Sequence, residues 1–262
     1  EFISLHAIKT SALLAKERGT YPTFGGSEWD KGNFPIDTFC ELMSERNPRE
    51  VSNDKLSFET LDEWDSVRDL VSQYGMRNSN VMAIAPTATI SYIQGCSQSI
   101  EPDYSVLFVY STLSGEFTMI NEHFVTAAKK KGIWSQGLVD ALKSVDGDVT
   151  ALVHLDDSLK EQFKNAFDMD FHTIIDAAAA RQKWIDMGQS LNLYNKHESL
   201  KYLNDMYLYA WEKGLKTTYY LRSKAATRLE KSTISDTNLK NQSIINEERS
   251  CSVLDPGCES CQ

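Results

Sequence analysis

The sequence lacks the features of a membrane-spanning or nucleic-acid-binding protein. No apolar run approaches the roughly 20 residues that cross a bilayer, and no signal-peptide pattern is present. Lys and Arg number 27 against 37 Asp and Glu, which gives a formal net charge of -10. Because sequence-independent binding to nucleic acid or to anionic membranes needs clustered Lys and Arg, we expect neither partner. The expected location is the cytoplasm.

The familiar phosphate-binding fingerprints and internal repeats are also missing. Neither a Walker A loop nor a GxGxxG motif occurs. What the chain does have is 262 residues, of which 41% are hydrophobic, enough to bury a sizeable core. Its five cysteines, in the absence of secretory features, suit a reducing compartment.

Two of these cysteines, Cys258 and Cys261, form a Cys-x-x-Cys pair beside the last residue. The preceding stretch, 232–248, is polar and has no sustained helical or strand period, so 232–262 is predicted to be a flexible tail after a folded region over 1–231. A coil of roughly 30 residues spans about 30 Å on average and about 100 Å at full stretch. Such a pair could shuttle electrons between a buried site and an external partner.

The local sequence around the cysteine pair leaves two other interpretations open. Cys-x-x-Cys is half of a tetrahedral zinc site, which needs two further Cys or His ligands. A structural disulfide would close only a short loop and would stabilise little. A redox pair is the leading interpretation, and no metal site is assigned. Cys40 and Cys96 are expected to be small buried hydrophobic residues.

The pattern of apolar residues, caps and glycines predicts a series of helices. The first ends at Gly19 and is followed by a loop-rich stretch to about Asn53. The next begins at a capping box formed by Thr60 and Glu63 and ends near Gly75. Further helices are predicted over 115–131, 136–145, 157–167 and 170–188.

Short strands indicate an α/β fold. A mostly buried strand is predicted over 80–85. The clearest unit is a strand over 190–194, a helix over 198–213 capped by Gly214, and a strand over 216–222. A strand, helix and strand of this length predict a right-handed parallel crossover.

The turn Pro86, Thr87, Ala88, Thr89, Ile90 and Ser91 follows the first predicted strand. Free backbone N–H groups at a helix N-terminus, with hydroxyls beside them, can bind a phosphate or a diphosphate. Thr and Ser also cap helices where no ligand binds, so the turn alone leaves both interpretations open.

Tyr219 and Tyr220 are adjacent, and in a regular strand their rings would point to opposite faces. Aromatic residues favour strands, which explains the pair without a function. Tyrosine is also oxidisable, and its phenolic proton can move with the electron. A functional role would require an electron path through this strand.

Together these segments resemble the large subunit of ribonucleotide reductase. The block 78–91, with Ser99 to Pro102 at its end, is similar to the family's substrate-phosphate segment. Other similar blocks follow the family order and cover essentially the whole chain; they are 15–19, 31–37, 181–186, 190–192, 217–220 and 258–261.

The resemblance implies an α/β fold that supplies the C-terminal half of a ten-stranded barrel, and the reduction of ribonucleoside diphosphates to 2′-deoxyribonucleoside diphosphates. Residues Pro86 to Ile90 would hold the substrate diphosphate. Tyr219 and Tyr220 would end a radical path from a separate small subunit that carries the tyrosyl radical and metal centre. Cys258 and Cys261 would re-reduce the active site and then be reduced by thioredoxin or glutaredoxin.

The family's large subunit is far longer than this chain. Its N-terminal region carries the effector sites, the thiyl-forming cysteine and the two cysteines that the substrate oxidises, and Cys40 and Cys96 do not match those positions. We therefore expect this chain to bind no cofactor itself, to be inactive alone and to associate with an N-terminal portion. The alternatives are a non-catalytic module that binds a partner or a metal, and part of a cobalamin-dependent reductase, which the tyrosine pair disfavours.

Overall fold

The computed structural model describes residues 1–46, 61–112, 115–197 and 199–223. The predicted tail with Cys258 and Cys261, and Thr60 of the predicted capping box, lie outside these residues. The helices are α1 (Phe2–Arg18), α2 (Pro35–Arg46), α4 (Trp64–Tyr74), α5 (Ile90–Gln94), α6 (Glu122–Lys130), α7 (Gln136–Ser144), the 3₁₀ turn η1 (Val149–Ala151), α8 (Asp157–Gln162), α9 (Phe171–Gln182) and α10 (Leu200–Glu212). The strands are β1 (Leu107–Thr112), β2 (Gly115–Ile120), β3 (Leu193–Asn195) and β4 (Leu221–Ser223).

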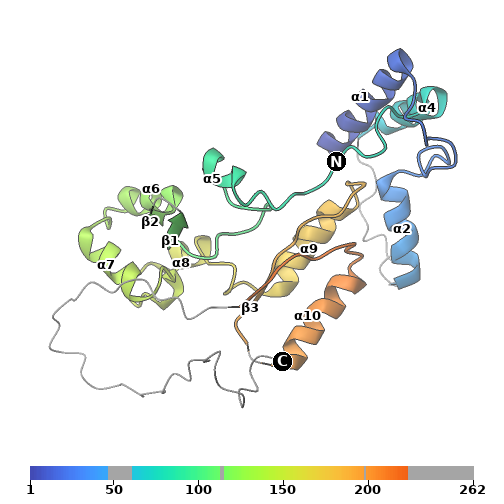
Figure 1. The fold of residues 1–262 in the computed structure, drawn as a ribbon. Coiled ribbons are helices and arrows are strands. Elements are labelled where there is room, and N and C mark those ends of the chain that lie inside the picture. Colours follow the sequence, from blue (N-terminus) through green and yellow to red (C-terminus); the bar gives the residue numbers. More distant parts are fainter. Residues whose placement is uncertain (47–60, 113–114, 198, 224–262) are drawn as a thin grey trace, which may run out of the picture. The chain divides into compact units, whose positions relative to one another are not determined.

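Helices α1, α2 and α4 share the first hydrophobic cluster, and α1 lies alongside α4 (Figure 1). Helix α1 ends at Gly19 as predicted, and α4 ends at Gly75. Helix α2 was not predicted, because Pro35 was interpreted as a loop residue. Proline is well suited to the first turn of a helix, and here the Asp37 carboxylate accepts the Phe34 N–H at 2.8 Å, so both residues start α2.

The second cluster packs β1, α6, α7, η1 and α8 around Phe124 and Leu142. The predicted helix over 115–131 was wrong in its first part, since 115–120 is β2 and pairs antiparallel with β1. Asn121 sets the boundary, because its side chain accepts the Phe124 N–H at 3.0 Å and caps α6 there. Helix α7 is as predicted, whereas α8 ends at Gln162 and α9 at Gln182, both earlier than expected.

The third cluster includes β3 and α10 of the parallel unit that the sequence predicted. Strand β3 pairs with β4 in parallel register, Leu193 opposite Leu221, and α10 connects them (Figure 1). Helices α9 and α10 contribute Ile175, Ala178 and Met206 to the buried side. The two strands are shorter and later than predicted, although Tyr219 N–H donates to Leu191 C=O at 2.7 Å just before β4 begins.

The predicted strand over 80–85 is reduced to one parallel bridge, between Ile84 and Gln189. The Asp186 carboxylate accepts the N–H groups of Val81 and Met82 at 2.7 and 2.9 Å, in place of strand partners. Asp186 and the bridge hold this segment beside the residues that precede β3. The strands of the described residues do not close a barrel, but the parallel unit is the kind of element from which one is built.

Gly147 offers a stability test of the second cluster. Its φ is +74°, and a Cβ there would overlap Ser105 Oγ and the Leu107 carbonyl oxygen. Gly147→Ala should therefore cost about 2–5 kcal/mol of local stability, from backbone strain and overpacking together. Amide exchange of β1 residues in the full-length protein measures this. Gly132→Ala is the matched control, since its φ is +69° with open space around it, and it should cost only about 1–2 kcal/mol. Equal losses of stability in Gly147→Ala and Gly132→Ala would contradict the close packing around Gly147.

Candidate functional site

Tyr219 and Tyr220 meet each other directly. Their ring centroids lie 4.0 Å apart, and the Tyr219 hydroxyl donates to the Tyr220 hydroxyl at 3.2 Å. The prediction that the rings point to opposite faces was wrong. Strand β4 begins only at Leu221, so the alternation of a regular strand does not apply to the pair.

The surroundings of the pair make it accessible and place a positive charge beside it. Tyr219 and Tyr220 are 43% and 54% exposed. The hydrogen bond to Tyr220 raises the pKa of the Tyr219 phenol. The Arg222 guanidinium lies 5.6 Å from the centroid of the Tyr220 ring. Two phenols in contact can exchange an electron and a proton over a short distance.

The turn Pro86 to Ile90 leads into α5, a helix of 5 residues that begins at Ile90. Thr87 has a positive φ of 50°, and its Oγ1 accepts the Ser99 N–H at 3.1 Å. Thr89 caps the helix without a side-chain hydrogen bond. Ala88, Thr89 and Ile90 are exposed, so this side of the turn is open to a ligand.

The sequence interpretation placed Ser91 in the turn but did not assign it to the site. Ser91 is only 1% exposed, and its hydroxyl has no hydrogen-bond partner. A buried hydroxyl without a partner is uncommon, because it loses its hydrogen bonds to water. The residue lies in the first turn of α5, next to the predicted phosphate-binding turn.

A buried carboxylate network was also missed. Glu101 is 5% exposed and accepts hydrogen bonds from Asn192 and Tyr194. Burial raises the pKa of Glu101 and also that of Tyr194. The partners are more than 90 residues apart in sequence, so no local pattern could have indicated the network. The only available signal was that Glu101 lies at the end of the block that resembles the family's substrate-phosphate segment.

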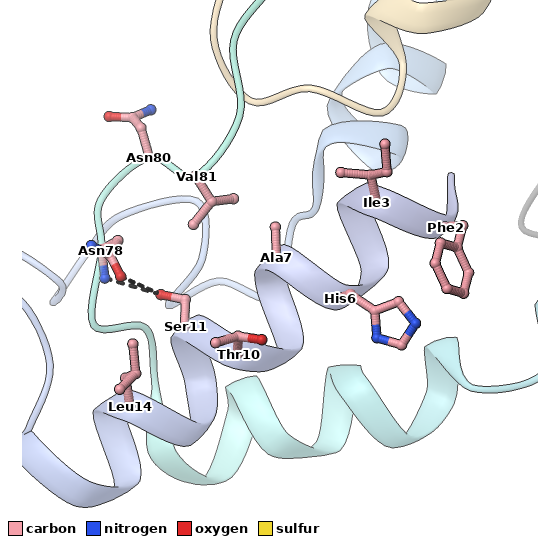
Figure 2. A pocket seen from close by; sticks show the side chains of 10 residues that line it. All are labelled: Phe2, Ile3, His6, Ala7, Thr10, Ser11, Leu14, Asn78, Asn80 and Val81. Atoms are coloured by element: carbon pink, nitrogen blue, oxygen red, sulfur yellow. Dashed lines mark hydrogen bonds between the residues drawn. The ribbon is translucent and has the colours of Figure 1, made fainter.

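The described residues also form a hollow elsewhere. It measures about 600 Å³ and is formed by one face of α1 and the segment 78–81 (Figure 2). Figure 2 shows Ser11 bonded to Asn78 at its edge, with Phe2 and His6 at one end. None of the predicted site residues lines it. The hollow is therefore not the predicted site.

Other candidate groups give no further site. Among the described residues, no set of three or more His, Cys, Asp or Glu side chains could hold a metal ion. In the same residues, no helix has both the length and the apolar character to cross a membrane. Cys40 is half-buried, but Cys96 is exposed, so the expectation that Cys96 is a buried hydrophobic residue was wrong.

The parallel unit and the paired tyrosines define an α/β protein with a candidate electron-transfer site. The family described as "Ribonucleotide reductase, barrel domain" matches residues 1–221. This chain therefore belongs to the ribonucleotide reductase barrel-domain family.

Individual relatives agree with this assignment. The chain is 48% identical to the ribonucleoside-diphosphate reductase subunit alpha of Chlamydia trachomatis over all of its own length and 26% of that protein. It is 35% identical to the large subunit of Trypanosoma brucei brucei, covering 92% of this chain and 28% of that one. The chain thus spans about a quarter of the length of these relatives.

The fold is similar to that of a solved structure, the class Id ribonucleotide reductase alpha subunit of Actinobacillus ureae. The TM-score is 0.52 at 27% sequence identity, over 76% of this chain and 37% of that chain. This match and the family match confirm the predicted fold class, an α/β fold that belongs to the ribonucleotide reductase barrel.

Proposed function

We propose that this chain is the part of a ribonucleoside-diphosphate reductase large subunit that relays the radical, binds the substrate diphosphate and re-reduces the active site. The contact between the Tyr219 and Tyr220 phenols carries the proposal. An electron path needs oxidisable groups in close contact, and this pair supplies two of them. The tyrosine pair favours a reductase with a radical-generating small subunit over the cobalamin-dependent class.

In the proposed reaction, a cysteine thiyl of the N-terminal portion removes the 3′-hydrogen of a ribonucleoside diphosphate. The 2′-hydroxyl leaves as water, and two thiols supply two electrons by closing a disulfide. The 3′-hydrogen is then returned, which regenerates the thiyl. This chain provides the route by which the radical arrives at that cysteine and the reductant that reopens the disulfide.

Three partners follow from these roles. The first is the N-terminal portion, which holds the thiyl cysteine and the effector sites. The second is the small subunit, which carries the tyrosyl radical and the metal centre, so this chain itself binds no cofactor. The third is thioredoxin or glutaredoxin, which reduces the disulfide of Cys258 and Cys261 in the reducing cytoplasm. Residues 232–262 serve as the tether for that pair, after a folded region over 1–231.

The turn Pro86 to Ile90 is proposed to bind the substrate diphosphate. Support comes from its exposed residues before α5 and from Ser91, whose buried hydroxyl has no hydrogen-bond partner. A phosphate oxygen could accept a hydrogen bond from this hydroxyl as well as from free backbone N–H groups. Hydrogen bonds to charged groups contribute more than those between neutral groups.

Ser91→Ala tests this assignment in the full-length large subunit. We expect CDP to bind about 10- to 100-fold more weakly, because one hydrogen bond to a charged oxygen is lost. Stability should hardly change, since the hydroxyl has no partner in the structure. Isothermal titration with CDP and thermal unfolding measure the two quantities.

Ser144→Ala is the control, because the Ser144 hydroxyl donates only to the Ala141 carbonyl on the exposed side of α7. It should leave the affinity for CDP unchanged. An unchanged affinity in Ser91→Ala as well would remove Ser91 from the diphosphate site.

A further inference from the structure

The Glu101 carboxylate connects three donors in a buried place. Its Oε1 accepts the Asn192 backbone N–H at 2.7 Å. Its Oε2 accepts the Asn192 side-chain amide at 3.0 Å and the Tyr194 hydroxyl at 2.7 Å. The positive charge of Arg222 favours the ionised carboxylate, against the effect of burial. Glu101 thereby joins the segment after α5 to the residues at the start of β3.

On one side, Glu101 is close to the proposed diphosphate turn through Ser99. The Ser99 N–H donates to Thr87 Oγ1, and the Ser99 hydroxyl donates to the Pro86 carbonyl, both at 3.1 Å. Ser99 is buried and has a positive φ of 53°. Only one residue separates it from Glu101. The turn is thus hydrogen-bonded to Ser99, and the backbone through Ile100 joins Ser99 to Glu101.

On the other side, the backbone next to Asn192 holds both tyrosines. The Leu191 carbonyl accepts the Tyr219 N–H at 2.7 Å, and the Leu193 N–H donates to the Tyr220 carbonyl at 2.9 Å. Asn192 lies between these two bonds. A shift of Asn192 would therefore move the backbone of the tyrosine pair.

We infer that Glu101 is a positioning residue that holds the diphosphate turn and the tyrosine pair in a fixed relation, through Asn192 and Tyr194. This inference rests on the proposed function, because it assigns the two ends of the connection to substrate binding and radical relay. Ordering of the turn by a nucleotide is then transmitted through Ser99 and Glu101 to the tyrosine backbone. Glu101 acts through Asn192 and Tyr194 and accepts no hydrogen bond from the Tyr219 or Tyr220 phenol.

Glu101→Gln breaks the connection with little change of shape. A glutamine oxygen can replace Oε2 and accept from Asn192 Nδ2 and Tyr194. Its amide then faces the Asn192 N–H. In the reverse orientation the amide faces the Asn192 Nδ2 and Tyr194 donors instead, so each orientation sets a donor against a donor. Tyr194→Phe is a milder second variant, since it removes one of the three bonds and adds no donor.

The experiment is hydrogen exchange, read by mass spectrometry, in the full-length large subunit with and without CDP. In the unaltered protein, CDP should slow exchange in 86–101 and also in 217–221. In Glu101→Gln, the slowing in 86–101 should persist, while exchange in 217–221 with CDP should be about tenfold faster than in the unaltered protein. The affinity for CDP should stay within about threefold, and turnover with the small subunit should fall at least about tenfold. Tyr194→Phe should change exchange in 217–221 and turnover in the same direction but by a smaller factor.

Asp103→Asn is the matched control. Asp103 lies two residues after Glu101, and its carboxylate accepts a hydrogen bond from the Asn121 side chain. It is not part of the path from the turn through Glu101 to the tyrosine pair. Asp103→Asn should leave exchange in 217–221 unchanged. Exchange in α9 separates positioning from a general loss of packing, because only the latter would raise it.

The outcomes distinguish the inference from the proposed function. Slowing in 217–221 that persists in Glu101→Gln would overturn the positioning role, as would slowing in 86–101 of the unaltered protein with none in 217–221. Faster exchange throughout α9 in both variants would also overturn it. If CDP fails to slow exchange in 86–101 of the unaltered protein, the assignment of the diphosphate turn falls, and the inference falls with it.

Discussion

Tyr220→Phe in the full-length large subunit is expected to lower turnover driven by the small subunit by at least about 10³-fold, or about 4 kcal/mol in the barrier. Phenylalanine cannot be oxidised at the potential at which a tyrosine relay works, so the path is interrupted. The ring is kept, and with it the packing against Tyr219. Binding of CDP should therefore be unchanged. Product formation and equilibrium binding of CDP measure the two effects.

Tyr207→Phe is the control for the loss of a phenol. Tyr207 is a partly exposed tyrosine of α10 and is not part of the pair. It should retain full turnover. Loss of CDP binding in Tyr220→Phe would indicate a packing role for the pair, and turnover that survives in Tyr220→Phe would exclude the relay.

The Cys258→Ser and Cys261→Ser variants are expected to complete roughly one turnover and then stop when thioredoxin is the reductant. The first turnover uses the active-site thiols that are already reduced. The next requires thiol–disulfide exchange with the tail, and a single remaining thiol cannot complete it. Rapid-quench measurement of deoxynucleotide per subunit shows the stall.

A small dithiol that reaches the active site directly should restore cycling in both variants. Cys96→Ser is the matched control, because this exposed thiol lies outside the Cys-x-x-Cys pair, and it should cycle normally with either reductant. Equal rates with thioredoxin and with the small dithiol in Cys258→Ser and Cys261→Ser would remove the shuttle role.

Elements that depend on local signals were predictable. Helices α1, α7 and α10 have the predicted positions, because Gly19 ends the first, and Ser135 and Ser199 cap the others. The parallel pairing of β3 and β4 followed from the length of the connection between them. The family resemblance, which drew on many short blocks in order, was confirmed by the match over residues 1–221.

Elements that depend on distant partners were predicted less well. The residue pattern of 115–120 is also compatible with the first turns of the helix that follows. Only pairing with β1 makes these residues a strand. The segment 80–85 looked like a strand because it is apolar, yet its N–H groups at Val81 and Met82 bond to Asp186, more than 100 residues away. Such partners are not visible in a local window of sequence.

The sequence by itself determined the family, the positions of α1, α7 and α10 and the residues that could carry chemistry, because caps, turns and motif order act over a few residues. Only the tertiary structure decided that the two tyrosine rings meet and that Glu101 joins the turn to their backbone. The physical reason is sequence separation. Ring contact depends on where β4 begins against β3, and the Glu101 network closes over more than 90 residues.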